Sequence, residues 1–356
     1  MMLSLIRHAP DHVHNSCVFL EDGPMAQQAR ELGTPVAVVP SGRARELWRV
    51  PGVVRRLRRA IRDQRADVVL AHVNKAHLYA GAAAKLERVP AAWWQHEHLE
   101  LKPRLQQVAS RVPAAAVICS AAWIAEQQRR YTRAPVHVVH AGVEPGALVS
   151  PPREHRAGAG DEVVIGVVGR LARWKRAQLA VRAMPLVRES IPSARLRIVG
   201  GPGVDADRGF AADLEAEIAR LGLGGVVELA GHTADAGAAI RGLDVLAHPA
   251  EREPWGLVLL EAMAAGIPVV ASAEGGPREI VRDGEDGLLV DAADTPAFAR
   301  ALVRVGSDPA LRGRMGAAGR ERVVGGFTAE SAARRLWELI GSELPATRLS
   351  WRGEGA

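Results

Sequence analysis

The chain has 356 residues, 48% of them hydrophobic, and its 46 basic and 40 acidic side chains give a formal net charge of +6. This length and hydrophobic content allow two ordinary domains with real cores. No run of 18 apolar residues and no secretory signal are present, so we expect no membrane-spanning helix. Two cysteines, Cys17 and Cys119, cannot build a disulfide framework or a zinc site by themselves, which favours a reducing cytoplasm.

Short β-branched runs alternate with helical segments through the first 145 residues. A Rossmann-like domain opens with a hydrophobic strand and a glycine-rich turn before its first helix. Residues 1–8 instead resemble the end of that helix, so we expect the first βα unit of this domain to be missing. Strands are predicted at 18–20, 36–39, 68–71, 92–95, 117–119 and 136–139.

Basic residues concentrate at 43–65, and residues 1–150 carry 20 basic against 12 acidic side chains, a balance of +8. One predicted helix there is crowded with arginine on one side and apolar residues on the other: Arg55, Arg56, Arg58, Arg59 and Arg62 with Val53, Val54, Leu57 and Ile61. Such a helix is typical of proteins that lie on an anionic membrane surface or bind nucleic acid. It also occurs as a solvated helix face in an arginine-rich chain. We expect no nucleic-acid partner, and peripheral contact with the inner face of the membrane stays open.

From residue 160 onward strands alternate with helices of ordinary length, which implies a parallel, doubly wound α/β sheet. Strands are predicted at 163–168, 195–199, 226–229, 244–248, 268–272 and 288–290. The composition predicts a first domain at 1–145, a Pro- and Gly-rich linker at 146–161, a second domain at 162–327, a terminal helix at 328–343 and a loose tail at 344–356. Two such domains joined by a hinge place a cleft between them, which suits two substrates.

Two carboxylates, Glu253 and Glu261, bracket a Pro-Trp-Gly turn and an aliphatic run. The first follows a predicted strand, and the second lies in the helix that leaves the loop. Ligands of open α/β sheets bind at the carboxyl ends of the strands, and the first N–H groups of that helix, on Leu257 and Val258, suit a phosphate. A ligand with a phosphate for the N–H groups and a polyol for each carboxylate would be a nucleotide sugar. The simpler interpretation is that both glutamates are solvated at the surface.

Gly169 follows the strand 163–168 directly and lets the backbone turn. Arg170 and Lys175 then project cations toward the same crevice, where guanidinium and ammonium groups suit phosphate oxygens. Lys175 is one of only four lysines in the chain, so background usage explains it less easily than it explains an arginine.

The second half resembles a retaining glycosyltransferase of the large GT-B family 4. The residues that carry the resemblance are Gly169-Arg-Leu with Lys175, Ile198-Val-Gly-Gly201, Gly231-His232, Glu253-Pro-Trp-Gly256 through Glu261 to Val270, Gly275-Gly-Pro-Arg-Glu279 and Gly284-Glu-Asp-Gly287 through Val290. They cover almost the whole second half, in order and at the usual spacings. The resemblance implies two Rossmann-like domains facing a central cleft, an N-terminal acceptor-binding domain and a C-terminal donor-binding domain.

The resemblance also implies the chemistry. A hexosyltransferase of this family moves a sugar from a UDP- or GDP-sugar to a glycan or lipid-linked acceptor with retention of anomeric configuration, as in cell envelope polysaccharide biosynthesis. No metal and no cofactor besides the donor substrate are implied. Arg170 and Lys175 would hold the donor diphosphate, Glu253 the transferred sugar and Glu261 the ribose. Backbone N–H groups and matching motifs would add further donor contacts from Gly256, Leu257, Val258, Gly169, Gly200 and His232.

The resemblance of the first half is weaker and includes a strand-end histidine beside the transferred sugar. Residues 93–98 place His96 there, with His98 second and His72 a lesser candidate. Nine of the twelve histidines lie in this half, so coincidence stays open. Family members open with a strand and a Gly-Gly loop that this chain lacks, which leaves the activity of this chain open. The alternatives are a catalytically weak nucleotide-sugar-binding relative and a GT-B sugar epimerase.

Overall fold

The computed structural model describes residues 2–42, 46–97, 103–144, 146, 162–201, 207, 209–291 and 293–344. The chain divides into two compact units. The first combines Met1–Ala141 with Ala329–Ala356, and the second is Gly142–Thr328. The predicted linker and tail lie almost wholly outside the described residues.

The first unit alternates strands and helices, and every strand pair in it is parallel. Its α15 comes from the end of the chain and packs with α1 around Leu5, Leu336 and Ile340. The elements are α1 (Met2–Arg7), β1 (Cys17–Phe19), α2 (Pro24–Glu31), β2 (Val36–Val38), η1 (Leu47–Arg49), α3 (Val50–Asp63), β3 (Val69–His72), α4 (Val73–Glu87), β4 (Ala91–Gln95), α5 (Pro103–Arg111), β5 (Ala116–Cys119), α6 (Ala122–Gln128), β6 (Val136–Val138) and α15 (Ala329–Glu343).

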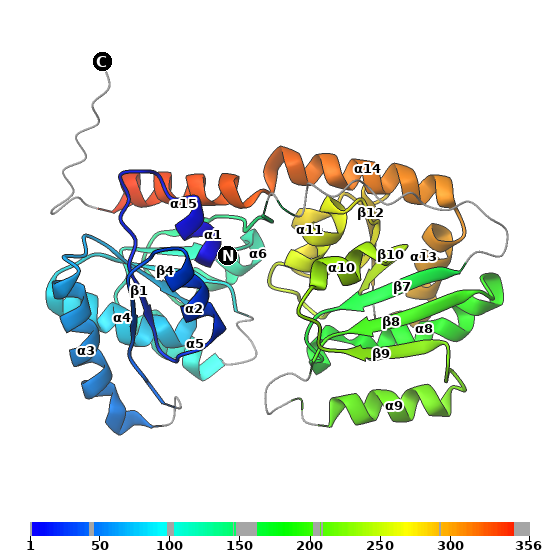
Figure 1. Ribbon diagram of the computed structural model, residues 1–356, viewed down its shortest axis with the longest axis horizontal. Helices are drawn as coiled ribbons and strands as arrows, with labels where there is room; N and C mark the ends of the chain where they lie inside the picture. Colours follow the sequence, from blue (N-terminus) through cyan, green and yellow to red (C-terminus); the bar gives the residue numbers. More distant parts are fainter. Residues whose placement is uncertain are drawn as a thin grey trace, which may run out of the picture. The chain divides into compact units, whose positions relative to one another are not determined.

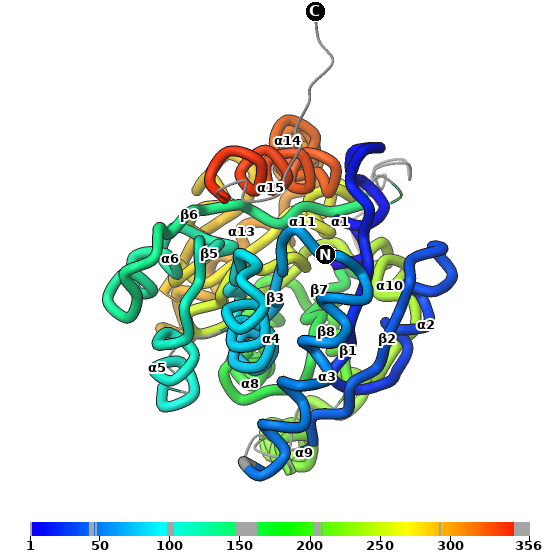
Figure 2. The backbone as a smooth tube through the Cα atoms, turned by 90° about the vertical axis from the view of Figure 1, so that its left-hand side faces the viewer, coloured from blue at the N-terminus to red at the C-terminus, as the bar shows by residue number. Residues whose placement is uncertain are grey.

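The strands of the first unit form two sheets, β1-β2 and β3-β4-β5-β6. In Figure 2, β1 and β2 lie on one side of β3, and β5 and β6 lie on the other. A doubly wound sheet has the order 3-2-1-4-5-6, so these sheets correspond to its two wings with the central strand left out. Among the described residues, α1 is the first element, and the missing first βα unit stays a prediction.

The arginine-rich helix predicted in the first unit is α3. Its apolar face is buried, because Val53 and Leu57 pack in a core with Tyr79. Arg58 and Arg62 both contact Glu87 at 2.6 Å. The apolar face is therefore part of the unit's own core, and the remaining arginines cover the outer side. None of the described helices combines the length and the apolar character needed to cross a membrane.

The second unit is a single six-stranded parallel sheet in the order β12-β11-β10-β7-β8-β9, and Figure 1 shows β7, β8 and β9 side by side. The strand order reverses between β7 and β10. Such a reversal is the topological switch point at which open α/β sheets bind ligands. The elements are β7 (Val163–Val168), η3 (Arg173–Lys175), α8 (Ala177–Ser190), β8 (Ala194–Val199), α9 (Phe210–Arg220), β9 (Val227–Gly231), α10 (Ala236–Arg241), β10 (Val245–His248), α11 (Leu257–Ala264), β11 (Val269–Ser272), α12 (Pro277–Ile280), β12 (Gly287–Val290), α13 (Thr295–Gly306) and α14 (Pro309–Gly326).

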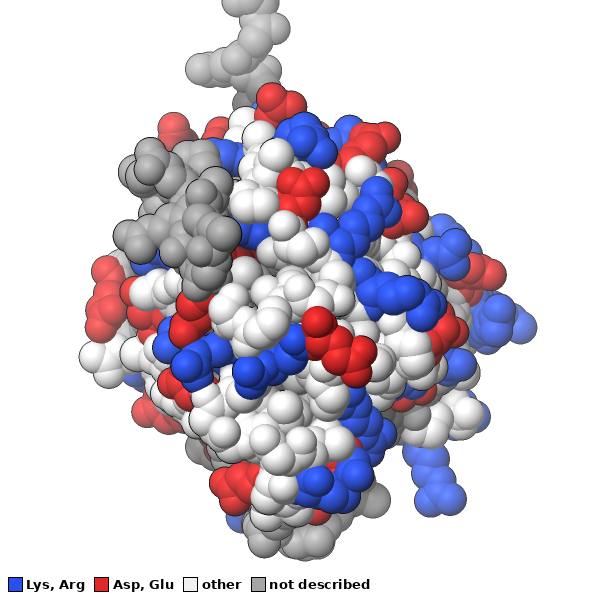
Figure 3. All heavy atoms as spheres, turned by 90° about the vertical axis from the view of Figure 1, so that its right-hand side faces the viewer, with Lys and Arg blue, Asp and Glu red and all other residues white. Residues whose placement is uncertain are grey.

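The core of this unit is made by β-branched strand residues and apolar helix faces, and Ile165, Met184, Leu196 and Phe298 are fully buried in it. The surface carries paired charges, for example Arg197 with Glu228 at 2.7 Å. On the face drawn in Figure 3, basic and acidic side chains are interspersed rather than gathered into a patch of one sign. The strong positive balance of the first half of the sequence thus does not extend to this face.

Candidate functional site

The candidate site lies at the carboxyl ends of β7 and β10, on either side of the switch point. Here the chain leaves β7 at Gly169, whose N–H donates to the Val199 carbonyl at 2.9 Å. Gly200 approaches so closely that a Cβ on it would lie 1.8 Å from the Gly169 carbonyl oxygen. The contact therefore requires glycine at 200, whereas at Gly169 the φ of 147° favours glycine although a Cβ would meet no neighbouring atom.

The two predicted cations after β7 have different environments. Lys175 ends the short η3 turn, is partly buried, and lies with Nζ 4.4 Å from the centre of the Trp174 ring. Arg170 is exposed, and its side chain makes no hydrogen bond or ion pair within the described part of the chain. Arg170 is thus available to an anionic ligand, whereas Lys175 is already engaged.

Lys175 is engaged by Glu253, the carboxylate that follows β10. Its Nζ donates to Glu253 Oε2, and His248 Nε2 lies 3.1 Å from the same oxygen. Glu253 is 6% exposed. Burial pushes the pKa of this carboxyl upward, but the Lys175 charge and the His248 hydrogen bond outweigh burial and lower the pKa to about 2. Glu253 is therefore a buried carboxylate that is ionised near pH 7.

Three further contacts hold the loop after β10, and two of them join it to the η3 turn. The Glu251 N–H donates to the Trp174 carbonyl at 2.7 Å, and Arg176 pairs with the Glu251 carboxylate at 2.9 Å. On the other side of the loop, the Gly276 N–H donates to the Glu253 carbonyl at 2.8 Å. The loop that carries Glu253 is thus held from both sides.

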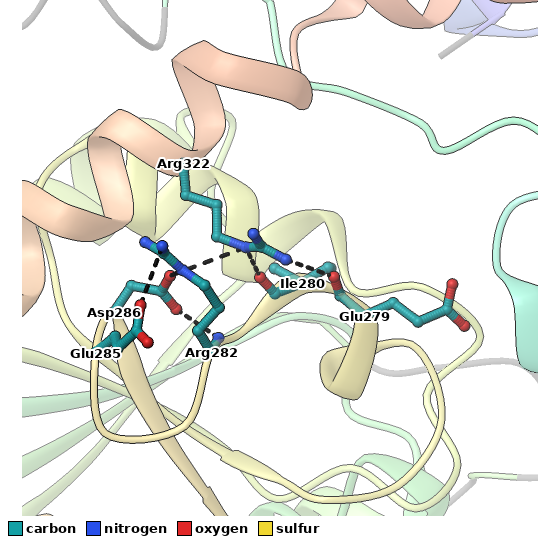
Figure 4. A network of polar contacts seen from close by, with 6 residues as sticks. All are labelled: Glu279, Ile280, Arg282, Glu285, Asp286 and Arg322. Atoms are coloured by element: carbon teal, nitrogen blue, oxygen red, sulfur yellow. Dashed lines mark hydrogen bonds and ion pairs between the residues drawn. The ribbon is translucent and has the colours of Figure 1, made fainter.

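The turn at Gly275-Gly276 is in turn secured by the network in Figure 4. Arg322 of α14 donates to the carbonyls of Glu279 and Ile280, the last residues of α12. Asp286 is fully buried and accepts a 2.6 Å bond from the Arg282 side chain. The Glu279 carboxylate extends away from this network. Through α12, the network fixes the two glycines that back Glu253.

The helix α11 begins immediately after the loop, at Leu257. Gly256 precedes it with a φ of 100°, a conformation that favours glycine. The first N–H groups of the helix, including those of Leu257 and Val258, have no partner inside the helix and suit an anion. Glu261 is partly buried one turn further on, and burial raises its pKa.

His232 follows β9 at the same edge of the sheet and is exposed. Its Cβ would lie 3.3 Å from a Cβ built on Gly201. The structure thus gathers Gly169, Gly200 and His232 at neighbouring strand ends, as the motif spacing predicts. Their predicted donor contacts remain predictions.

The first unit brings together His72, Trp94 and His96 at the carboxyl ends of β3 and β4. The ring centres of the two histidines lie 5.7 Å apart, and those of His72 and Trp94 lie 5.6 Å apart. Burial lowers the pKa of His96 to about 4, and burial together with the charge of His96 lowers that of His72 to about 3. Both imidazoles are therefore neutral near pH 7. His98 lies outside the described residues.

Two local features orient these histidines. Val73, directly after His72, has a φ of 64°, which is an outlier for a β-branched residue and marks local strain. Gln95 is fully buried and donates to Asn74 at 2.7 Å and to Gln106 at 2.6 Å, while its oxygen accepts the Glu97 N–H at 2.9 Å. The turn that carries His96 is thus fixed by a buried amide network that the sequence does not predict.

His248 is the main site residue that sequence reasoning missed. It closes a fully buried strand, where a histidine is usually a core residue, and nothing in the sequence relates it to Glu253. The signal that could have found it is its place at the end of β10, beside the predicted switch point.

Two family models match the chain. The model described as Glycosyl transferases group 1 matches residues 153–322, and the one described as Glycosyltransferase Family 4 matches residues 1–146. Among solved structures, Anabaena Alr3699/HepE in complex with UDP and glucose superposes with a TM-score of 0.84 at 22% identity, covering 96% of this chain and 95% of that chain. The fold predicted from the sequence is confirmed: it is the two-domain α/β fold of GT-B glycosyltransferases.

Curated relatives agree with this class. The lipopolysaccharide core biosynthesis glycosyltransferase LpsE of Rhizobium meliloti is 29% identical over 228 residues, 64% of this chain and 64% of that protein. The GDP-mannose-dependent alpha-(1-6)-phosphatidylinositol monomannoside mannosyltransferase of Mycolicibacterium smegmatis is 34% identical over 195 residues, 52% of this chain and 49% of that protein. The matches span less than two thirds of either relative. Taken together, the family models, the fold and the relatives support a GT-B glycosyltransferase.

Proposed function

We propose that the chain is a retaining glycosyltransferase of family 4 that moves a hexose from a UDP- or GDP-sugar to a glycan or lipid-linked acceptor. The observation that carries the proposal is the Lys175–Glu253 ion pair at the switch point, next to the N-terminus of α11. A cation, free N–H groups and a buried carboxylate at one edge of the sheet suit a sugar attached to a diphosphate.

In this proposal the residues act by binding and by charge stabilisation. Arg170 and Lys175 contact the diphosphate and stabilise the negative charge that develops as the sugar leaves. Glu253 accepts hydrogen bonds from hydroxyls of the transferred sugar, and Glu261 from those of the ribose. His96, a neutral imidazole, serves a sugar hydroxyl. No metal is required, because cations and helix N–H groups supply the positive field.

Retention follows if the acceptor attacks on the face that the leaving group vacates. The acceptor hydroxyl then transfers its proton to the departing diphosphate, so no protein carboxylate needs to act as the nucleophile. Glu253 suits a mechanism without a protein nucleophile or base, because a carboxylate with a pKa of about 2 that is engaged by Lys175 is a poor base. Its part is to hold the sugar in place.

We further propose a cytoplasmic enzyme that meets its acceptor at the inner face of the membrane. The support is the excess of arginine in the first unit, where Arg55 and Arg59 on α3 are exposed. Liposome sedimentation with anionic lipid tests this point. The result that would reject it is binding that is absent, or that is unchanged by added salt.

The test of the transferase proposal is calorimetry with UDP-glucose and GDP-mannose, followed by transfer assays with glycan and lipid-linked acceptors. We expect one donor to bind, and Lys175→Ala or Glu253→Ala to weaken that binding about tenfold or more. Arg197→Ala, which removes a surface ion pair elsewhere in the same unit, is the matched control. If neither donor binds the unaltered protein, the proposal fails.

A nucleotide-sugar binder without turnover is the second candidate. The division of the first unit's strands into two sheets favours it, because a split sheet would weaken a domain that binds the acceptor. Donor binding without transfer or donor hydrolysis, at any acceptor tested, would identify this alternative.

A further inference from the structure

One oxygen of Glu253 receives two donors at once. Lys175 Nζ and His248 Nε2 both contact Oε2, while Oε1 makes no hydrogen bond to any residue that the structure describes. The carboxylate is therefore held by one oxygen and offers the other. The two donors are not equivalent, and the difference between them has a functional consequence.

His248 is fixed, whereas Lys175 can move. His248 is 4% exposed and closes β10, which pairs with β11 at this residue and with β7 further back. Lys175 sits on the short η3 turn with an unbranched side chain that is 18% exposed. A diphosphate beside η3 would compete with Glu253 for the Lys175 ammonium. His248, in contrast, is held in a buried strand that is paired on both sides.

We propose that His248 is a positioning residue that keeps Glu253 aimed at the donor sugar when Lys175 turns to the diphosphate. This inference rests on the proposed function. Without His248, a carboxylate released by Lys175 would be buried with no donor on it and free to rotate, and the geometry of its sugar contacts would be lost.

The chemistry of His248 suits this task. Burial, the largest influence, lowers the pKa of its imidazole, so the ring is neutral and contacts Glu253 as an Nε2–H donor. A neutral donor orients a carboxylate without adding another cation that would attract the diphosphate away from Lys175 and Arg170. His248 therefore separates recognition of the sugar from recognition of the phosphates.

The test compares a nucleoside diphosphate with the matching nucleotide sugar, UDP with UDP-glucose and GDP with GDP-mannose, in the full chain by calorimetry. We expect His248→Leu to weaken binding of the sugar nucleotide about tenfold or more and binding of the bare diphosphate less than about twofold. His248→Gln, whose amide N–H can replace Nε2–H, should recover most of the loss. Ser272→Ala, a buried polar substitution at the end of the neighbouring strand β11, is the control for packing.

Each outcome bears on the proposal. Suppose that the unaltered protein binds the sugar nucleotide. If His248→Leu then weakens binding of the sugar nucleotide and of the bare diphosphate equally, or weakens neither, the positioning role is wrong while the proposed function stands. Should His248→Leu fail to fold, His248→Gln and His248→Ala replace it, and equal sugar affinity in those two variants overturns the inference. If no sugar nucleotide binds the unaltered protein, the proposed function falls first and the inference with it.

Discussion

From the Lys175–Glu253 ion pair we predict a change in the free energy of unfolding and its dependence on pH. Replacing Lys175 with methionine removes the strongest favourable charge beside a carboxylate that is 6% exposed. The lysine stem is largely kept in length, so packing changes little. In the variant, His248 is the remaining hydrogen-bond donor to Glu253. The Lys175 charge no longer offsets the free-energy cost of burying the ionised carboxylate.

The magnitude follows from the pKa of Glu253, which falls from an ordinary 4.5 to about 2 in the folded chain. At 1.36 kcal/mol per pKa unit, the ionised carboxylate stabilises the folded state by about 3 kcal/mol at pH 7. Because the folded pKa is the lower one, this stability is fully present above about pH 4.5 and is lost as the pH falls toward about 2. At pH 3 about 1.5 kcal/mol remains.

We therefore expect Lys175→Met to reduce the free energy of unfolding by at least about 3 kcal/mol at pH 7, in line with breaking a buried ion pair, and by clearly less at pH 3. Urea unfolding at both pH values measures it. Adding Glu253→Gln to Lys175→Met should recover most of the loss, because a neutral amide carries no buried charge. A loss that is equal at both pH values, or that persists in the double variant, would refute the reasoning.

Three further changes test other parts of the site. Arg170→Ala should weaken donor binding about tenfold and leave the melting temperature unchanged, because this exposed side chain has no protein partner among the described residues. Gly275→Ala should cost about 1–3 kcal/mol of unfolding free energy in urea, since its φ is 72° and the new Cβ would lie 2.4 Å from the Glu253 carbonyl oxygen; Gly224→Ala, where space is open, is its control. Burial raises the pKa of Cys119 to about 12, so this thiol should resist alkylation at pH 8 until urea unfolds the chain, and labelling of the native protein there would contradict its burial.

Much of the second unit could be predicted from the sequence, because its strands are β-branched runs bounded by glycine. The prediction for 163–168 coincides with β7 at both ends. The exception is α14, which the sequence did not indicate as a helix. Its 18 residues include five glycines, which lower helix propensity. The structure explains them in part: Gly316 packs so closely on Gly266 that a Cβ would lie 2.0 Å from the Gly266 carbonyl oxygen.

The candidate site could be predicted as a set of residues but not as a set of contacts. Glycine turns, cations and carboxylates each leave a local pattern, so Gly169, Lys175 and Glu253 could be named. Their pairing depends on the order β10-β7, which places residues 78 positions apart side by side. Strand order is a tertiary property, and the same holds for the division of the first unit into two sheets.

The contact of Lys175 with Glu253 also bears on how a donor would bind. In the structure the two charges compensate each other, so the buried carboxylate is not left as a large unpaired charge. A diphosphate brings its own negative charges, and Lys175 can exchange one anionic partner for another at little electrostatic cost. Glu253 would keep its hydrogen bond from His248 during this exchange. In the proposed function, the positioning role of His248 thus complements the exchange of partners at Lys175.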